Sequence, residues 1–248
     1  MTAYMQSFLL LKLAEVLGVV AVLLIAGTSG RLLFRPVDFK YPAREGHYSI
    51  GLFVVIFALA FFYYRMGIRI GFTDQEVLLP YSRQFLLAII CLAVTTLLLF
   101  YRRQPLLSAG WGRRQNFNLG LRMGIMLAFL SIILRGKVSA LINGLTASEG
   151  LALLLILGIC VAEESIFRGY LQLRFSSWLG QRNGWLITAG LFVLWRIPFL
   201  LLDLPGFWLN ISLLIVQSLL LGWVMQKCGH VLAPALYRTV SDWLILLQ

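Results

Sequence analysis

The sequence predicts an all-α, polytopic integral membrane protein, a bundle of about eight transmembrane helices. Hydrophobic residues make up 60% of its 248 residues, whereas a soluble domain has about 45–50%. Apolar runs of about 20 residues, the length with which a helix crosses a bilayer, recur along the whole chain. Helices fit these runs better than strands, because in lipid the backbone must satisfy its own hydrogen bonds. The predicted helices are 5–27, 49–66, 84–101, 117–134, 148–172, 184–202, 207–227 and 231–247.

The first predicted helix is not a signal peptide, since no basic stretch precedes its apolar run and Lys12 and Glu15 interrupt it. These two residues are three apart and can pair on one helix face. The predicted helices fill most of the chain, so we expect one membrane domain without a soluble part. Within it, residues 1–100 hold the first three helices and residues 101–248 hold the other five.

The formal net charge of +11 would suggest a nucleic-acid partner for a soluble protein. In a membrane protein, basic loops that fix orientation explain it, and no nucleic-acid partner is expected. The loops after the first, third, fifth and seventh helices carry more Lys and Arg than the others. They are therefore predicted in the cytoplasm with both termini outside, as in a multi-pass protein of the bacterial inner membrane or another cytoplasm-facing membrane. The richer loops hold Arg31, Arg35, Lys40, Arg44, Arg102, Arg103, Arg113, Arg114, Arg174, Arg182 and Lys227. The other loops hold Arg65, Arg69, Arg83, Arg135 and Lys137.

Two smaller features have structural interpretations. The stretches FFYYR (61–65) and FYRR (100–103) place aromatic and basic residues at predicted helix ends, where such residues anchor a helix at the membrane surface. The cysteines Cys91, Cys160 and Cys228 are isolated in or near apolar segments, and no C-x-x-C pair occurs. They are predicted to be buried free thiols.

Ionisable residues also lie inside three predicted helices of the C-terminal half, where a central charge costs roughly 2.5–3.5 kcal/mol. Glu164 and Arg168 are four residues apart, as are Arg238 and Asp242, so each pair lies on one helix face. Such residues form either structural ion pairs that lock the bundle or a functional site, and the charge pattern alone favours neither. The candidate site residues are Glu163, Glu164, Arg168, Arg196, Arg238 and Asp242.

Three stretches around these residues keep the order and spacing of known motifs. They are EESIFRG at 163–169, FVLWR at 192–196 and GHVLAPALYRTVSD at 229–242. The first has the form EExxxR, and together they resemble the CPBP family: the CAAX proteases and bacteriocin-processing enzymes, also called Abi proteins, which include the Ras-converting-enzyme-like prenyl proteases. The family's second and third motifs read F-x-x-x-H and, after G-x-x-x-A-P, H-x-x-x-N. RRQPLLSAGW (102–111) resembles the loop before the family's core, so the resemblance covers roughly residues 100–248.

The resemblance implies an intramembrane endopeptidase that cleaves prenylated or membrane-embedded peptides. In that family, a glutamate of the first motif and the histidine of the second activate a water molecule. The histidine and asparagine of the third motif hold the oxyanion. Members are often called metalloproteases.

The chain differs from these motifs at the positions where the family has its catalytic histidines and asparagine. Arg196 and Arg238 stand where histidine is expected, and Asp242 stands where asparagine is expected. Arginine has no acceptor lone pair, so it is neither a general base nor a metal ligand, and an ionised Asp242 repels an oxyanion. The two histidines, His47 and His230, lie elsewhere; His230 is eight residues before Arg238, about 12 Å along a helix. We expect no metal and no cofactor, since catalytic zinc usually has three protein ligands.

The replacements instead predict a network of ion pairs. Glu163 or Glu164 should lie within about 4 Å of Arg196 or Arg238, and Asp242 should pair with Arg238. The leading hypothesis is a pseudoprotease that acts as a scaffold, assembly factor or accessory subunit, surrounded by lipid and bound to other integral membrane proteins through its first three helices. The second hypothesis is an active CAAX-type endopeptidase with an altered glutamate site. The third is a transporter or channel, although the sequence shows no paired broken helices and no repeat.

Overall fold

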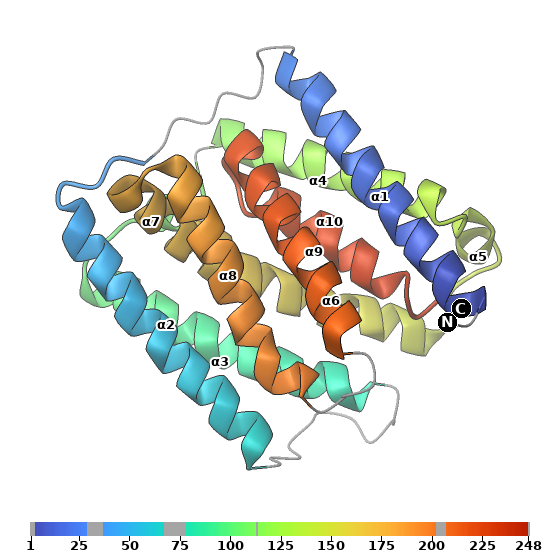
Figure 1. The fold of residues 1–248 in the computed structure, drawn as a ribbon, viewed down its shortest axis with the longest axis horizontal. Coiled ribbons are helices and arrows are strands. Elements are labelled where there is room, and N and C mark those ends of the chain that lie inside the picture. The colour runs from blue at the N-terminus through green and yellow to red at the C-terminus, as the bar shows by residue number, and fades with distance from the viewer. Residues whose placement is uncertain (1–2, 29–36, 67–77, 113, 202–206, 248) are drawn as a thin grey trace.

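The computed structural model describes residues 3–28, 37–66, 78–112, 114–201 and 207–247, and this part of the chain is helical, without strands. Figure 1 shows the helices packed side by side in one bundle. In chain order they are α1 (Ala3–Thr28), α2 (Pro42–Arg65), α3 (Leu79–Tyr101), η1 (Leu106–Ala109), α4 (Arg114–Leu134), α5 (Val138–Ile142), α6 (Ala147–Glu164), η2 (Ser165–Leu171), α7 (Gln172–Leu179), α8 (Gln181–Leu200), α9 (Phe207–Cys228) and α10 (Leu232–Trp243).

The all-α membrane architecture is confirmed, and the predicted number of spanning helices is approximate. Among the described residues, six helical stretches are long and apolar enough to cross a membrane: 42–65, 79–101, 116–134, 147–179, 181–200 and 207–228. The last predicted helix, α10, has 12 residues, which span about 18 Å. That is shorter than the roughly 30 Å of a hydrocarbon core, so α10 crosses only part of the membrane.

One continuous helical stretch, made of α6, η2 and α7, runs through the middle of the bundle. Every residue from Ala162 to Phe175 is buried, as expected of a helix enclosed on all sides. In Figure 1, α8 and α9 cross in front of this stretch, and α2, α3 and α10 also contact it. It therefore carries Glu163, Glu164 and Arg168 into the centre of the molecule.

The N-terminal end of the central stretch is fixed by a capping box at Thr146. The Thr146 hydroxyl accepts from the Glu149 N–H at 3.3 Å, and the Thr146 N–H donates to Oε2 of Glu149 at 2.7 Å. This arrangement satisfies N–H groups that the first turn of a helix leaves without a partner. Thr146 and Glu149 therefore define where α6 starts.

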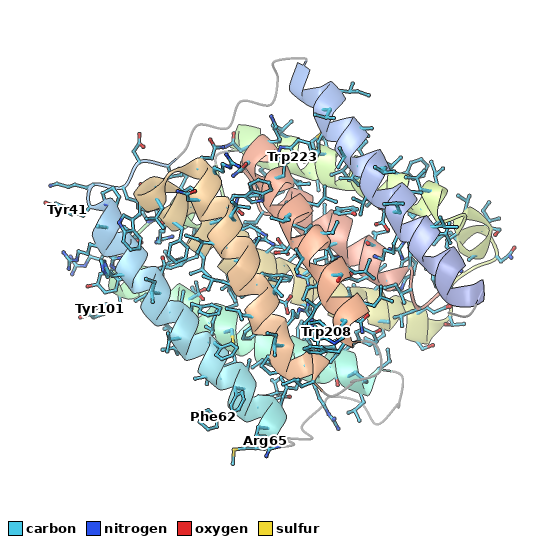
Figure 2. All side chains as sticks on the ribbon, in the orientation of Figure 1. Tyr41, Phe62, Arg65, Tyr101, Trp208 and Trp223 are labelled. Atoms are coloured by element: carbon cyan, nitrogen blue, oxygen red, sulfur yellow. The ribbon has the colours of Figure 1, made fainter. Side chains whose placement is uncertain are left out.

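Exposed aromatic residues mark two ends of the bundle. Figure 2 places Tyr41 and Tyr101 at one end of the α2–α3 pair, and Phe62 and Arg65 at the other, where Trp208 also lies. Tyr41, Phe62 and Trp208 are well exposed, and aromatic side chains gather at the two surfaces of a membrane. The predicted anchors at 61–65 and 100–103 lie at these ends.

The loops predicted on the cytoplasmic side meet at one end of the bundle. Glu45 near the start of α2 binds Arg102 after α3 and Arg174 in α7. The Val231 N–H, between α9 and α10, donates to the carbonyl of Gly110 at 3.2 Å. Which membrane side this end faces stays a prediction. Of the loop residues that support it, Arg31, Arg35, Arg69 and Arg113 lie outside the described residues.

Arg174 is a correction to the sequence analysis, which placed it in a loop. The helix continues past 172 to Leu179, so Arg174 lies within it and its side chain is fully buried. Its guanidinium binds Glu45 and lies 3.5 Å from the centre of the Tyr170 ring. Arg102 likewise donates two hydrogen bonds of 2.7 Å to Glu45, so both arginines hold helices together.

Candidate functional site

The structure brings all the predicted site residues into one group, which we call the arginine–carboxylate cluster. Its six residues come from four helical elements. Four of these residues, Glu163, Glu164, Arg168 and Arg238, are at most 1% exposed. Three carboxylates and three guanidinium groups face one another, so the buried charges balance. The cluster consists of Glu163 and Glu164 on α6, Arg168 on η2, Arg196 on α8, and Arg238 and Asp242 on α10.

Arg238 is the centre of the cluster. Its Nη2 donates to Oε2 of Glu163 at 2.6 Å, its Nη1 to Oε1 of Glu164 at 3.0 Å, and its Nε to Oδ2 of Asp242 at 3.3 Å. Nη2 of Arg196 donates to the same Oε2 of Glu163 at 2.7 Å. The ion pairs predicted from the sequence are therefore confirmed.

Arg168 connects the cluster to the neighbouring helices. Its Nε lies 3.3 Å from Oε2 of Glu164. Its Nη2 donates to the carbonyl and the hydroxyl of Ser218 on α9, at 2.9 and 2.8 Å. The Ser218 hydroxyl donates in turn to the carbonyl of Ala189 on α8 at 3.1 Å. This arginine of the EExxxR motif thus fixes how α8 and α9 pack on the central stretch.

Several cluster contacts were missed by the sequence analysis. Oε1 of Glu163 accepts from Gln84 of α3 at 3.3 Å and from the Trp195 indole at 3.4 Å, and Gln217 of α9 donates to Asp242 at 3.1 Å. Gln84 and Gln217 are amide side chains inside apolar runs, and this feature of the sequence could have indicated that they take part in the cluster. Their partners could not be read from the sequence, because they come from other helices.

An aromatic ring underlies the three guanidinium groups. The centre of the Phe192 ring lies 5.2 Å from the guanidinium carbon of Arg168, 5.7 Å from that of Arg196 and 4.9 Å from that of Arg238. A cation within about 6 Å of a ring is attracted to its face. Phe192 stands where the resemblance predicts the phenylalanine of the F-x-x-x-H motif, and here it helps to hold arginines.

A cavity of about 330 Å³ lies beside the cluster, between α1, α8, α9 and α10. Arg196, Arg238 and Asp242 line one side of it, and Lys12 and Glu15 of α1 line the other. The side chain of Asp242 is 31% exposed and that of Arg196 is 13% exposed. These two residues are the part of the cluster that a small molecule in the cavity can reach.

A second ion pair lies next to the cavity, at Glu15. Arg135, which the sequence analysis placed in a loop, is buried and donates to Oε2 of Glu15 at 2.8 and 2.6 Å. It also donates to the Ser241 hydroxyl of α10 at 3.0 Å, as does Lys12 at 2.9 Å. The predicted Lys12–Glu15 pair is present at 3.8 Å. Together these contacts tie α1 to α4 and α10.

The stretch directly after Glu163 and Glu164 is π-helical. A π-turn inserted in an α-helix is uncommon and occurs frequently at functional sites. It also brings Gly169 against the loop at η1, where a side chain on Gly169 would overlap the carbonyl oxygen of Ala109. The local geometry of the first motif is therefore set by this close approach, which only glycine permits.

The histidines lie outside the cluster. His230 is buried in the connection between α9 and α10, where its Nδ1 accepts from the Leu232 N–H at 3.1 Å. Burial lowers the pKa of His230 to about 4, so it is neutral at physiological pH. His47, predicted in a loop, lies in α2 and packs on Trp178. Within the described part of the chain, no three His, Cys, Asp or Glu side chains are grouped so as to hold a metal.

One comparison with known proteins supports the family resemblance. Residues 147–244 match the family model described as Type II CAAX prenyl endopeptidase Rce1-like. The match runs from α6 to α10 and contains every member of the arginine–carboxylate cluster. It confirms the resemblance that the three motifs indicate. No curated protein and no solved structure matches the chain.

Proposed function

We propose that this chain, whose residues 147–244 match the family model described as Type II CAAX prenyl endopeptidase Rce1-like, is a multi-pass membrane protein that has lost peptidase activity. It works by binding, as a scaffold, an assembly factor or an accessory subunit among other integral membrane proteins. The observation that carries the proposal is the engagement of Glu163 and Glu164 by Arg238, with Arg196 sharing Glu163.

Hydrolysis of an amide needs a group that can take a proton from water. Both oxygens of Glu163 already accept from protein donors: Oε1 from Gln84 and Trp195, and Oε2 from Arg196 and Arg238. Placing a water molecule against this carboxylate, or a proton on it, breaks buried ion pairs. General acid–base catalysis raises a reaction rate by about 10²–10⁴-fold. We expect Glu163 not to provide this contribution.

The second requirement is a site that accommodates negative charge on the substrate. One oxyanion donor contributes about 10²–10³-fold, and Arg238 uses its nitrogen atoms on three carboxylates. Asp242 stands where the family has asparagine, and its carboxylate faces the cavity. Negative charge on the substrate would meet negative charge on the protein, so this contribution is also lost.

A cleavage assay on the full chain in lipid nanodiscs tests the proposal. The probes are a farnesylated peptide and a peptide embedded in the membrane. We expect neither the parent nor Glu163→Ala to cleave them above the protein-free background. Restoring the family residues together, Arg196→His, Arg238→His and Asp242→Asn, provides the comparison with a histidine-containing site.

Cleavage that depends on the glutamates would contradict the proposed loss of activity. If the parent cleaves either peptide, and Glu163→Ala or Glu164→Ala abolishes cleavage without lowering the melting temperature, the chain is an active endopeptidase with an altered site. The cavity that reaches Asp242 and Arg196 favours this second candidate, because it gives a substrate a route to the cluster. The assay decides between the two functions directly.

The binding part of the proposal predicts a partner surface on the first three helices. On α1, the side chains of Leu10, Leu13 and Leu17 are 55–67% exposed and, at spacings of three and four, form one apolar stripe. We expect the full chain, purified in mild detergent, to retain a stoichiometric integral membrane protein. Leu13→Trp together with Leu17→Trp should release it, whereas Leu154→Trp on the exposed face of α6 should not. Purification of the parent as a single species would contradict the subunit role.

A further inference from the structure

An apolar groove lies between α2 and α3, away from the arginine–carboxylate cluster. Its volume is about 760 Å³. Gly51 leaves open space in its lining, since no atom lies within 4 Å of where a side chain would begin. One end of the groove is polar, and the rest is apolar. The polar end holds Arg44, His47 and Tyr48, and the apolar length holds Leu52, Val55, Val94 and Leu98.

The length of the groove fits one leaflet of a bilayer. From Arg44 to Val55 the helix rises eleven residues, about 16 Å at 1.5 Å per residue. The hydrocarbon core of a bilayer is about 30 Å thick, so the groove extends from one membrane surface to the middle. A spanning helix of a partner protein would need about twice this length. An acyl chain attached to a headgroup has the matching length and polarity.

The polar end of the groove carries unmatched positive charge. The nearby carboxylate, Glu45, is fully used: it accepts two hydrogen bonds of 2.7 Å from Arg102, one of 3.0 Å from Gln104 and one of 3.2 Å from Arg174. Arg44 has a long contact of 3.4 Å to the Tyr48 hydroxyl, and its guanidinium carbon lies 5.7 Å from the centre of the Tyr48 ring. Within the described residues no carboxylate pairs with it. Its guanidinium is exposed and available to an anion.

The groove also lies at the correct depth for a headgroup. Figure 2 places Tyr41 and Tyr101 at this end of the α2–α3 pair, and both are well exposed. Aromatic side chains of this kind sit at the level of lipid headgroups. The ring of His47 donates through Nδ1 to the Ala43 carbonyl at 2.6 Å, which orients the ring within the lining of the groove.

We infer that this groove binds one anionic phospholipid. The guanidinium of Arg44 holds the phosphate, because arginine binds phosphate through two parallel hydrogen bonds. One acyl chain passes over Gly51 and lies between α2 and α3. The inference does not depend on the proposed function, since the groove contains none of the cluster residues.

Native mass spectrometry of the full chain tests the inference. The protein is released from mild detergent in the presence of equal amounts of phosphatidylglycerol and phosphatidylcholine. We expect the parent to retain one phosphatidylglycerol. Arg44→Gln should reduce the preference for phosphatidylglycerol over phosphatidylcholine about tenfold, the usual effect of losing a charged hydrogen bond.

A pair of matched glycine variants tests the apolar part of the groove. Gly51→Phe fills the space in which the acyl chain lies and should abolish retention of both lipids. Gly190→Phe is the control, because Gly190 of α8 also lies within a helix with open space beside it. It should retain lipid like the parent. The melting temperatures of both glycine variants verify that they fold. Arg44→Gln changes an exposed side chain and should leave folding unaffected, so it tests lipid binding even if a glycine variant fails to fold.

Three results would overturn the inference. The parent could retain both lipids equally, or Gly51→Phe could retain lipid as well as Gly190→Phe does. In a third result, Gly51→Phe could release an integral membrane protein and leave the bound lipid in place. This would assign the groove to a partner protein and contradict the phospholipid assignment.

Discussion

At the scale of single residues, Arg238 donates to three carboxylates, one from each of its nitrogen atoms. A histidine at this position would offer one donor and one acceptor when neutral. Arginine offers five donors and no acceptor. Arginine at this position is therefore suited to holding carboxylates in place and not to moving protons. Arg196 likewise donates to Oε2 of Glu163, the oxygen that also accepts from Arg238.

His230 gives a prediction for the pH dependence of stability. Its pKa is lowered by burial to about 4 in the folded protein, from an ordinary value of 6.5. The unfolded chain therefore binds a proton at pH values where the folded chain does not. Stability is greatest above pH 6.5, falls as the pH is lowered towards 4, and stops changing below that. The full loss from this group is at most about 3.4 kcal/mol, at 1.36 kcal/mol for each pKa unit.

The matched variant for this prediction is His230→Asn. Asparagine can still accept from the Leu232 N–H, as at other helix starts, but it does not titrate. Melting temperatures measured from pH 7.5 to pH 4.5 should fall more steeply for the parent than for the variant. Parallel curves would show that His230 is not the group whose protonation matters.

At the scale of elements, η2 shows why the geometry of the first motif depends on packing. Gly169 lies against the carbonyl oxygen of Ala109, with Val231 also close by. Gly169→Ala should therefore lower the free energy of unfolding by about 1–3 kcal/mol through overpacking. Gly190→Ala, in open space on α8, should raise it or leave it unchanged, since alanine favours the helix. Equal effects of the two substitutions in thermal unfolding would refute the close-packing explanation.

The elements also show how far the sequence carries the fold and the site. Apolar runs of spanning length predict the long helices, and motif order predicts that Glu163, Arg196 and Arg238 meet. The π-turn is not predictable, because EESIFRGYLQ is equally compatible with an ordinary α-helix and the choice is made by the neighbouring loop. The burial of Arg135 and Arg174 is not predictable either. Their acidic partners are 120 and 129 residues away along the chain, and a charge is buried only where such a partner meets it.

At the scale of the whole molecule, the connections after α1, α3, α7 and α9 should face the cytoplasm. Single cysteines test this orientation, since Cys91, Cys160 and Cys228 are buried and should not react. A membrane-impermeant maleimide added to intact cells should label Ile142→Cys on α5, at the opposite end. It should not label Leu106→Cys on η1. Both parent residues are exposed, and labelling at Leu106→Cys alone would reverse the orientation.

The whole bundle also contains ion-paired charges in its interior. Within the described part of the chain, three ion-paired groups connect helices that are distant in sequence: the arginine–carboxylate cluster, Glu15 with Arg135, and Glu45 with Arg102 and Arg174. Removing one partner of a buried ion pair costs about 3–5 kcal/mol, because the other charge is left without compensation. The charged residues of the first motif are accordingly expected to stabilise the fold of this chain.

A double-mutant cycle on Glu163 and Arg238 measures how much their ion pair stabilises the fold. The free energy of unfolding is measured for the parent, Glu163→Gln, Arg238→Gln and the double variant. Each single variant should lose about 3–5 kcal/mol. The double variant, which restores the charge balance, should lose less than the sum of the two by about 0.5–3 kcal/mol. Single losses below about 1 kcal/mol, or losses that add without coupling, would show that the two residues do not form the stabilising ion pair on which the account rests.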